Sequence, residues 1–221
     1  MRGRCGRDQK IAEITTRIVQ GAGRVGAAVS EDALGALGAY IGLLTKWNRR
    51  LNLTALALEP LSEEAVDRLV VEAIVAAAYV RPSDRIAIDI GSGGGSPAIP
   101  LKVMVPALQL VLVESKARKA AFLREAVREL GLTGVEVETG RFEDIAGGWH
   151  RDLVDLVTIR AVRTDASLWE GIWSVLSPAG RVFWFGSSVP ESSAAVPAAV
   201  SETHALIPHR SSQLAILSRP N

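Results

Sequence analysis

Hydrophobic residues in the first third of the chain recur at the spacing of an amphipathic helix. Leu34, Leu37 and Ile41 lie three or four positions apart, and Ser30 precedes them in a sequence typical of a helix N-cap. A second helix is predicted from 62 to about 80, because apolar residues again recur at this spacing and two glutamates follow the starting serine. The N-terminal third is therefore predicted to be helical.

From residue 85 onward, short apolar runs alternate with helical segments. Strands alternating with helices favour a parallel sheet covered by helices on both faces. We therefore predict an α/β doubly wound sheet, mostly parallel with an antiparallel last strand, over 83–221, behind an N-terminal helical extension over 1–82. Strands are predicted at 86–90, 110–114, 135–138, 154–159 and 181–186, helices at 97–105, 116–130 and 165–176, and a closing antiparallel pair at 203–207 and 213–217.

Composition and charge narrow the classes of function. The chain has 221 residues, with 25 Lys and Arg against 24 Asp and Glu, so its formal net charge is +1. A surface that is basic all over is thereby excluded, and contact with nucleic acid requires a local basic patch. Cys5 is the only cysteine, and His150, His204 and His209 are scattered, so neither an internal disulfide nor a metal site is predicted.

Two segments lack the patterns of a signal peptide and of a membrane-spanning helix, and a third lacks the pattern of a strand or helix of the core. The first ten residues are basic but lack the apolar run that follows in a signal peptide. The longest apolar stretch, 73–80, is far shorter than the ~20 residues of a membrane-spanning helix, so we expect no membrane association and a cytoplasmic location. Residues 187–200, rich in Ser, Ala and Pro, are predicted to form a loop or a weak surface helix.

A glycine-rich loop between the first strand and the following helix is the strongest local signal. The sequence DIGSGGGSP occupies 89–97, and its glycines allow backbone conformations and close approaches that other residues do not. A dinucleotide-binding loop has its third glycine where Ser96 stands, whereas the spacing Asp-x-Gly-x-Gly-x-Gly resembles the loop of S-adenosylmethionine-dependent methyltransferases. The loop residues predicted to contact a cofactor are Gly91, Gly93, Gly95 and Ser96.

Two carboxylates accompany this loop. Glu114 ends the next predicted strand, 23 positions after Gly91, where a carboxylate can accept hydrogen bonds from both ribose hydroxyls of a nucleoside cofactor. Asp89 either contacts the cofactor or caps the amides of its own loop, and the sequence leaves both interpretations open.

Three separated stretches of the chain resemble one family. They are KWNRRLNLTA at 46–55, DIGSGGGSPAIPL at 89–101, and Glu114-Ser115 followed by Lys119, Phe122 and Leu123, and they are similar to the signatures of the RsmG (GidB) methyltransferases. The resemblance continues through 141–143 and 159–162 and spans about 34–186. Many methyltransferases share the glycine loop, but the Trp-Asn-x-x-x-Asn-Leu-Thr run is far more specific.

The resemblance implies a Rossmann-like class I methyltransferase that uses S-adenosyl-L-methionine to methylate N7 of one guanine in bacterial 16S rRNA. The implied partner is this RNA or the small ribosomal subunit. By the same resemblance, the cofactor positions fall on Gly91, Ser96, Phe142, Glu143 and Arg160, with Glu114 in the ribose role. The chain departs from the family pattern at Leu69, Ala73, Ser96 and in the fifth strand.

Basic residues gather in two places although the net charge is small. One cluster follows the first predicted helix, and the other lies along the helix predicted at 116–130. Contact with RNA phosphates needs such a basic rim, and the alternative for the second cluster is an ordinary solvated helix face. The candidates for contact with RNA are Lys46, Arg49, Arg50, Lys116 and Lys119.

The reaction implied by the resemblance needs little acid–base chemistry. Guanine N7 carries a lone pair in the neutral base, so no general base is required, and no catalytic acid–base pair is predicted. Arg160 or Arg163 is a candidate for positioning guanine O6 or a neighbouring phosphate. Trp47 is interpreted as a core anchor of its helix rather than as a platform for an RNA base.

Other classes of function remain open at this stage. One is a methyltransferase that acts on another RNA or on a small molecule, and another is a non-catalytic RNA-binding relative that keeps the fold. A nicotinamide-dependent dehydrogenase comes third, since Ser96 replaces the third glycine and no hydride-transfer site is evident.

Overall fold

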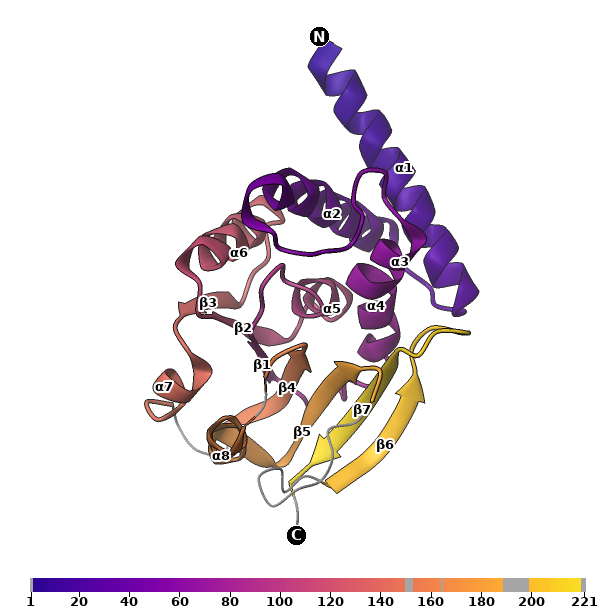
Figure 1. Cartoon of the computed structure of the whole chain (residues 1–221). Helices are drawn as coiled ribbons and strands as arrows, with labels where there is room; N and C mark the ends of the chain where they lie inside the picture. Colours follow the sequence, from indigo (N-terminus) through magenta and orange to yellow (C-terminus); the bar gives the residue numbers. More distant parts are fainter. Residues whose placement is uncertain (1, 150–152, 164, 189–198, 220–221) are drawn as a thin grey trace.

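A mixed β-sheet forms the centre of the fold (Figure 1). The structure is a computed structural model that describes residues 2–149, 153–163, 165–188 and 199–219. Its strands are β1 (Ile86–Ile90), β2 (Gln109–Glu114), β3 (Val135–Thr139), β4 (Val154–Arg160), β5 (Leu176–Gly186), β6 (Ala199–Ala205) and β7 (Gln213–Ser218). Within the described ranges these seven strands pair in the order β3-β2-β1-β4-β5-β7-β6. Strands β1 to β5 are parallel, and β7 is antiparallel to both β5 and β6.

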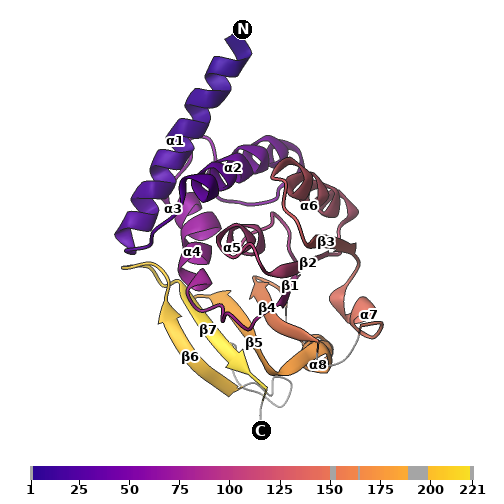
Figure 2. The same ribbon diagram turned by 180° about the vertical axis from the view of Figure 1, so that it is seen from behind.

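Helices cover both faces of this sheet (Figure 1, Figure 2). Successive residues of a strand face opposite sides, so Ala87 belongs to one hydrophobic core and Ile88 to the other. The first face carries α1 (Arg2–Arg24), α2 (Glu31–Leu51), α3 (Glu63–Val66), the π-helical turn η1 (Asp67–Val71), α4 (Glu72–Ala77), α5 (Ala98–Met104) and α6 (Ala117–Glu129), and the second carries α7 (Phe142–Ala146) and α8 (Ala166–Val175). The predicted α/β sheet with an N-terminal helical extension is confirmed.

Two N-terminal helices begin where the sequence predicts. Ser30 Oγ accepts a hydrogen bond from the Ala33 amide at 3.3 Å before α2, and Ser62 Oγ accepts one from the Ala65 amide at 3.1 Å before α3. Helix α1, which the sequence pattern does not delimit, packs along α2, and its N-terminal end extends beyond the rest of the chain in both views (Figure 1, Figure 2). Among the described residues, no helix is long and apolar enough to cross a membrane.

The helix predicted over 62–80 is interrupted. Its middle is the π-turn η1, and the helical part ends at Ala77. A π-turn widens the helix and changes the hydrogen bonding of its carbonyls, and here the carbonyl oxygens of Arg68 and Leu69 accept hydrogen bonds from side chains of other elements. Tertiary contacts therefore override the regular helical period of this segment.

The end of the sheet also differs from the prediction. The strand expected at 203–207 lies at 199–205, because Leu206 and Ile207 are buried apolar residues of the turn rather than of the strand. The segment predicted as a loop or surface helix, 187–200, falls mostly outside the described residues, and its last two residues begin β6.

The predicted domain boundary at residue 82 stays a prediction. Hydrophobic residues of the N-terminal helices and of the sheet share one core.

Gly35→Ala is expected to stabilise the protein. Gly35 is an exposed residue inside α2, and a Cβ atom there would meet nothing within 4 Å. Because alanine loses less backbone freedom than glycine on folding, the free energy of unfolding should rise by about 0.5–1 kcal/mol. Gly38→Ala is the matched control in the same helix, since its Cβ would lie 2.9 Å from Thr15 Cγ2 of α1. Denaturant titration compares the two, and equal gains would contradict this packing of α1 on α2.

Candidate functional site

The carboxyl ends of β1, β2 and β4 bring four polar side chains to one edge of the sheet. Asp89, Glu114 and Thr158 each lie two positions after a residue of the first core, and Arg160 lies two positions after Thr158. They therefore face the side covered by α2, α4 and α5. In open α/β sheets this edge is where ligands bind.

The glycine loop occupies the turn from β1 into α5. The amides of Gly91 and Ser92 both donate to the carbonyl of Val113 in β2, at 2.9 and 3.0 Å. Gly91 has a φ of +72°, and a Cβ atom there would lie 2.6 Å from Cγ2 of Val162, the second residue after β4. Gly95 has a φ of +85° and would place a Cβ 2.5 Å from Ile99 Cδ1. The loop thus needs glycine at both positions.

Glu114 fastens this loop to β2. Its carboxylate accepts hydrogen bonds from the Gly93 amide at 2.9 Å and from the Lys116 amide at 2.7 Å, one on each oxygen. The side chain is buried, so these amide contacts hold a negative charge directly beneath the glycine loop. An ionised carboxylate has about four lone-pair positions, which leaves acceptor capacity for a ligand.

Asp89 lies buried beside Glu114 in the sheet. Thr158 Oγ1 donates to Asp89 Oδ1 at 2.5 Å, whereas Asp89 Oδ2 has no hydrogen-bond partner among the described residues. Burial raises the pKa of Asp89 to about 6, although the Thr158 hydroxyl and the charge of Arg160 act in the opposite direction. The side chain interacts with the side chains of Thr158 and Ser92, and no amide of the described loop residues donates a hydrogen bond to it.

Asp89→Asn is expected to change how stability depends on pH. The pKa of Asp89 rises from 3.8 in the unfolded chain to about 6, so between these values only the folded chain holds the proton, and stability falls as pH rises. Asparagine keeps an oxygen for Thr158 and carries no charge, so the variant should gain up to about 3 kcal/mol at neutral pH. Unfolding free energies measured from pH 4 to 7.5 test this, and parallel profiles for both proteins would contradict it.

Arg160, at the end of β4, is held by the N-terminal helices. Its Nη2 donates to Glu72 Oε2 at 2.5 Å, and its Nη1 donates to the Arg68 carbonyl and, at 3.2 Å, to Ser96 Oγ. Its guanidinium also lies 4.9 Å from the centre of the Phe185 ring. Burial lowers the pKa of Arg160, and the carboxylate of Glu72 counteracts this effect. The predicted site residues Ser96 and Arg160 are therefore in direct contact.

Tyr40 and Glu72 contact predicted site residues, and the sequence pattern does not identify them. The buried hydroxyl of Tyr40 donates to the carbonyl of Gly94 at 2.7 Å, and burial raises its pKa. Tyr40 lies within the apolar stripe of α2, and this placement alone gives no sign of its contact with the loop. Glu72 stands four positions after Arg68, a spacing that indicates an ion pair on the surface of one helix and gives no sign of a contact with Arg160.

The other predicted cofactor residues lie at the start of α7. Phe142 is buried in the second core, with its ring centre 6.0 Å from that of Trp149, while Glu143 is half-buried. The side chain of Phe142 thus contributes to packing, and the role of Phe142 and Glu143 toward a cofactor stays a prediction.

The two basic clusters lie on neighbouring helices. α2 packs against α6, where the ring of Trp47 meets Phe122 edge-on at 5.8 Å, which confirms Trp47 as a core anchor. Lys46 contributes to lowering the pKa of Glu125, after the larger effect of the hydrogen bond from Arg128, so Lys46 lies near α6. The cluster residues Lys46, Arg50 and Lys116 are exposed, Lys119 is half-buried, and Arg49 forms a two-point ion pair with Glu59 at 2.8 and 2.6 Å.

The parallel sheet, its antiparallel β7 and the glycine loop after β1 define a class I methyltransferase fold. Mitomycin 7-O-methyltransferase MmcR superposes on 96% of this chain and 68% of its own, with a TM-score of 0.57 at 18% sequence identity. That likeness concerns the fold alone. Residues 34–212 match the GidB family, described as rRNA small subunit methyltransferase G, and the chain belongs to this family.

Two relatives illustrate how far the similarity extends. A ribosomal RNA small subunit methyltransferase G from Neisseria gonorrhoeae (strain NCCP11945) is 38% identical over 146 residues, which are 66% of each chain. A protein of the same name from Dehalococcoides mccartyi (strain CBDB1) is 34% identical over 166 residues, 75% of this chain and 69% of that one. The chain thus spans about two thirds of the length of these relatives.

Proposed function

We propose that this chain transfers a methyl group from S-adenosyl-L-methionine to N7 of one guanine in the 16S rRNA of the small ribosomal subunit. The observation that carries the proposal is the glycine loop, fastened by Glu114 at the carboxyl edge of the sheet. Family membership and the names of the relatives support an rRNA substrate. Such a substrate implies a cytoplasmic location.

Two buried polar atoms support a cofactor at this edge. Within the described residues, Asp89 Oδ2 and Arg160 Nε have no hydrogen-bond partner, although buried polar atoms are nearly always paired. An open acceptor and an open donor on neighbouring strands suit the amino and carboxylate groups of the methionine part of the cofactor. Glu114 would hold the ribose, and the start of α7, with Phe142 and Glu143, would hold the adenine.

The proposed reaction depends on orientation rather than on proton transfer. S-adenosyl-L-methionine supplies a methyl group bonded to a positively charged sulfur, and the neutral guanine N7 has a lone pair to accept it. The chain has to hold both partners in line and exclude water, and such alignment can contribute on the order of 7–11 kcal/mol. Arg163, exposed just beyond β4, is the residue that we assign to guanine O6 or a nearby phosphate.

Lys46→Ala combined with Lys116→Ala is expected to weaken RNA binding without affecting the cofactor. Each lysine that neutralises a phosphate on binding releases a counterion from the RNA. The negative slope of log binding constant against log salt concentration should therefore become shallower by about 0.7–0.9 for each lysine removed. Arg49→Ala is the matched control, because Arg49 is already paired with Glu59 and should change the slope less. Titration of a 16S rRNA fragment at several salt concentrations tests this, and an unchanged slope in the double variant would contradict it.

Methyl transfer to small ribosomal subunits tests the proposal as a whole. Subunits that lack the modification are incubated with the full chain and tritiated S-adenosyl-L-methionine, with large subunits as the control, and the labelled nucleosides are identified. The proposal predicts label in N7-methylguanosine of 16S rRNA only. Label in another nucleoside or another RNA would indicate a different substrate, and cofactor binding without any label would indicate a non-catalytic relative.

A further inference from the structure

The turn between β6 and β7, residues 206–212, contacts both ends of the π-turn η1. Arg210 Nε donates to Asp67 Oδ2 at 2.9 Å, and Asp67 is the first residue of η1. Ser212 Oγ donates to Glu72 Oε1 at 2.5 Å, and Glu72 directly follows η1. A segment near the C-terminal end of the chain therefore holds the helical segment that binds Arg160.

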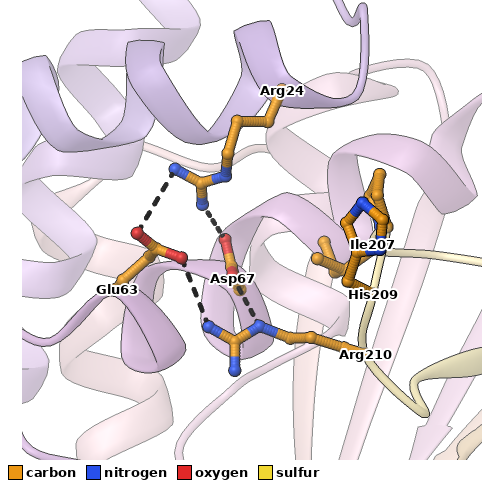
Figure 3. Close-up of a pocket in the computed structure, with 7 residues that line it drawn as sticks. Arg24, Glu63, Asp67, Ile207, His209 and Arg210 are labelled. Carbon is orange, nitrogen blue, oxygen red and sulfur yellow. Dashed lines mark hydrogen bonds and ion pairs between the residues drawn. The ribbon is translucent and has the colours of Figure 1, made fainter.

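Figure 3 shows the contact at the start of η1, on the wall of a cavity of about 490 Å³. The buried carboxylate of Asp67 lies between Arg24 of α1, at 2.5 Å, and Arg210 of the β6–β7 turn. Glu63 lies near both arginines, at 3.8 and 3.4 Å. Because these arginines are already paired with carboxylates, the cluster acts as a brace for η1 rather than as a binding site for another ion.

The contact at the end of η1 leads directly to Arg160. Glu72 is only 2% exposed, and each of its carboxylate oxygens accepts a hydrogen bond from a different residue. Oε1 accepts from Ser212, and Oε2 accepts from Nη2 of Arg160, both at 2.5 Å. A carboxylate bonded on one oxygen alone can rotate, whereas one bonded on both is fixed. Arg68 Nε lies 3.8 Å from the same Oε1, beyond hydrogen-bond distance, so Ser212 is the hydrogen-bond donor that sets the plane of the carboxylate to which Arg160 is bonded.

We propose that Ser212 is a positioning residue that acts through Glu72 to fix the guanidinium of Arg160 at the carboxyl edge of the sheet. The β6–β7 turn, remote in sequence from the glycine loop, thereby becomes part of the cofactor site. This inference rests on the proposed function only for the role of Arg160 toward the cofactor. The chain of contacts itself, Ser212 to Glu72 to Arg160, is independent of what the protein methylates.

An NMR measurement tests the positioning without any substrate. The ¹H–¹⁵N signal of Arg160 Nε is assigned by its loss in Arg160→Lys. We expect Ser212→Ala to broaden or shift this signal, Ser212→Thr to restore it, and Ser211→Ala, at the exposed neighbouring serine, to leave it unchanged. An Arg160 signal that is the same in Ser212→Ala as in the wild-type chain would overturn the proposal.

A double-mutant cycle tests the consequence for the cofactor. Calorimetric titration with S-adenosylhomocysteine should give an affinity about tenfold lower for Ser212→Ala, since one hydrogen bond to a charged group is removed, and within about twofold of wild type for Ser211→Ala. In the Arg160→Lys background, Ser212→Ala should cause little further loss. If Ser212→Ala lowered the affinity for S-adenosylhomocysteine by the same factor in both backgrounds, the two residues would act independently and the proposal would be overturned. Coupled affinities without methyl transfer to any RNA would reject the proposed substrate and leave the positioning role standing.

Discussion

Replacing Arg160 with alanine is expected to destabilise the protein by about 3–5 kcal/mol and to abolish cofactor binding. The reason is the buried ion pair, in which Glu72 is 2% and Arg160 13% exposed. Removing the arginine leaves a buried negative charge without its partner, which costs far more than the loss of a surface ion pair. The carbonyl of Arg68 and the hydroxyl of Ser96 lose the same donor.

Two further variants separate this ion pair from other effects. Arg163→Ala removes an exposed arginine three positions later and should change the free energy of unfolding by less than about 0.5 kcal/mol. Glu72→Gln, added to Arg160→Ala, should restore part of the lost stability because it removes the unpaired charge. Denaturant titration measures all three. Equal free energies of unfolding for Arg160→Ala and Arg163→Ala would contradict the buried ion pair between Arg160 and Glu72.

Gly91→Ala is expected to weaken S-adenosyl-L-methionine binding by about 100-fold or more. A side chain at a φ of +72° costs roughly 1–2 kcal/mol, and the overlap of its Cβ with Val162 Cγ2 at 2.6 Å adds strain of about 1–3 kcal/mol. Both costs are relieved only if the loop moves away from the end of β4. Because the loop and this end of β4 form the proposed site together, the movement should disrupt binding.

Gly93→Ala provides the comparison for this prediction. Gly93 also has a positive φ, of +51°, but a Cβ there would meet nothing closer than the Gly91 carbonyl oxygen at 3.7 Å. Its loss of affinity should therefore reflect backbone strain alone, about tenfold. Calorimetric titration of the two variants measures the difference. A Gly91→Ala protein that bound as tightly as Gly93→Ala would show that Val162 does not confine the loop.

The parts of the site that the sequence predicted are those set by local structure. The glycine loop, its strand and Glu114 follow from the order of elements, because a strand, a glycine-rich turn and a helix occur in immediate succession. The period of two places Arg160 on the same face as Thr158, but that this is also the face of Asp89 follows only from the pairing of Asp89 with Thr158 in the structure. Ser30 and Ser62 cap their helices for the same local reason.

The contacts that the sequence could not predict join residues far apart in the chain. Arg160 and Glu72 are 88 positions apart, and Tyr40 and Gly94 are 54 apart. The π-turn in 67–71 has no sequence mark of its own, since its carbonyls turn toward donors supplied by β4 and the glycine loop. Leu206 and Ile207 extend the apolar pattern beyond β6, which displaced the predicted strand by several residues.

Calorimetric titration of this chain with S-adenosyl-L-methionine and S-adenosylhomocysteine tests most directly whether the loop between β1 and α5 binds a sulfonium nucleoside. We predict saturable heat for both compounds with the wild-type chain and with Gly35→Ala, whose substitution lies outside the site, and none with Arg160→Ala. An absence of heat for both compounds with the folded wild-type chain would contradict the account.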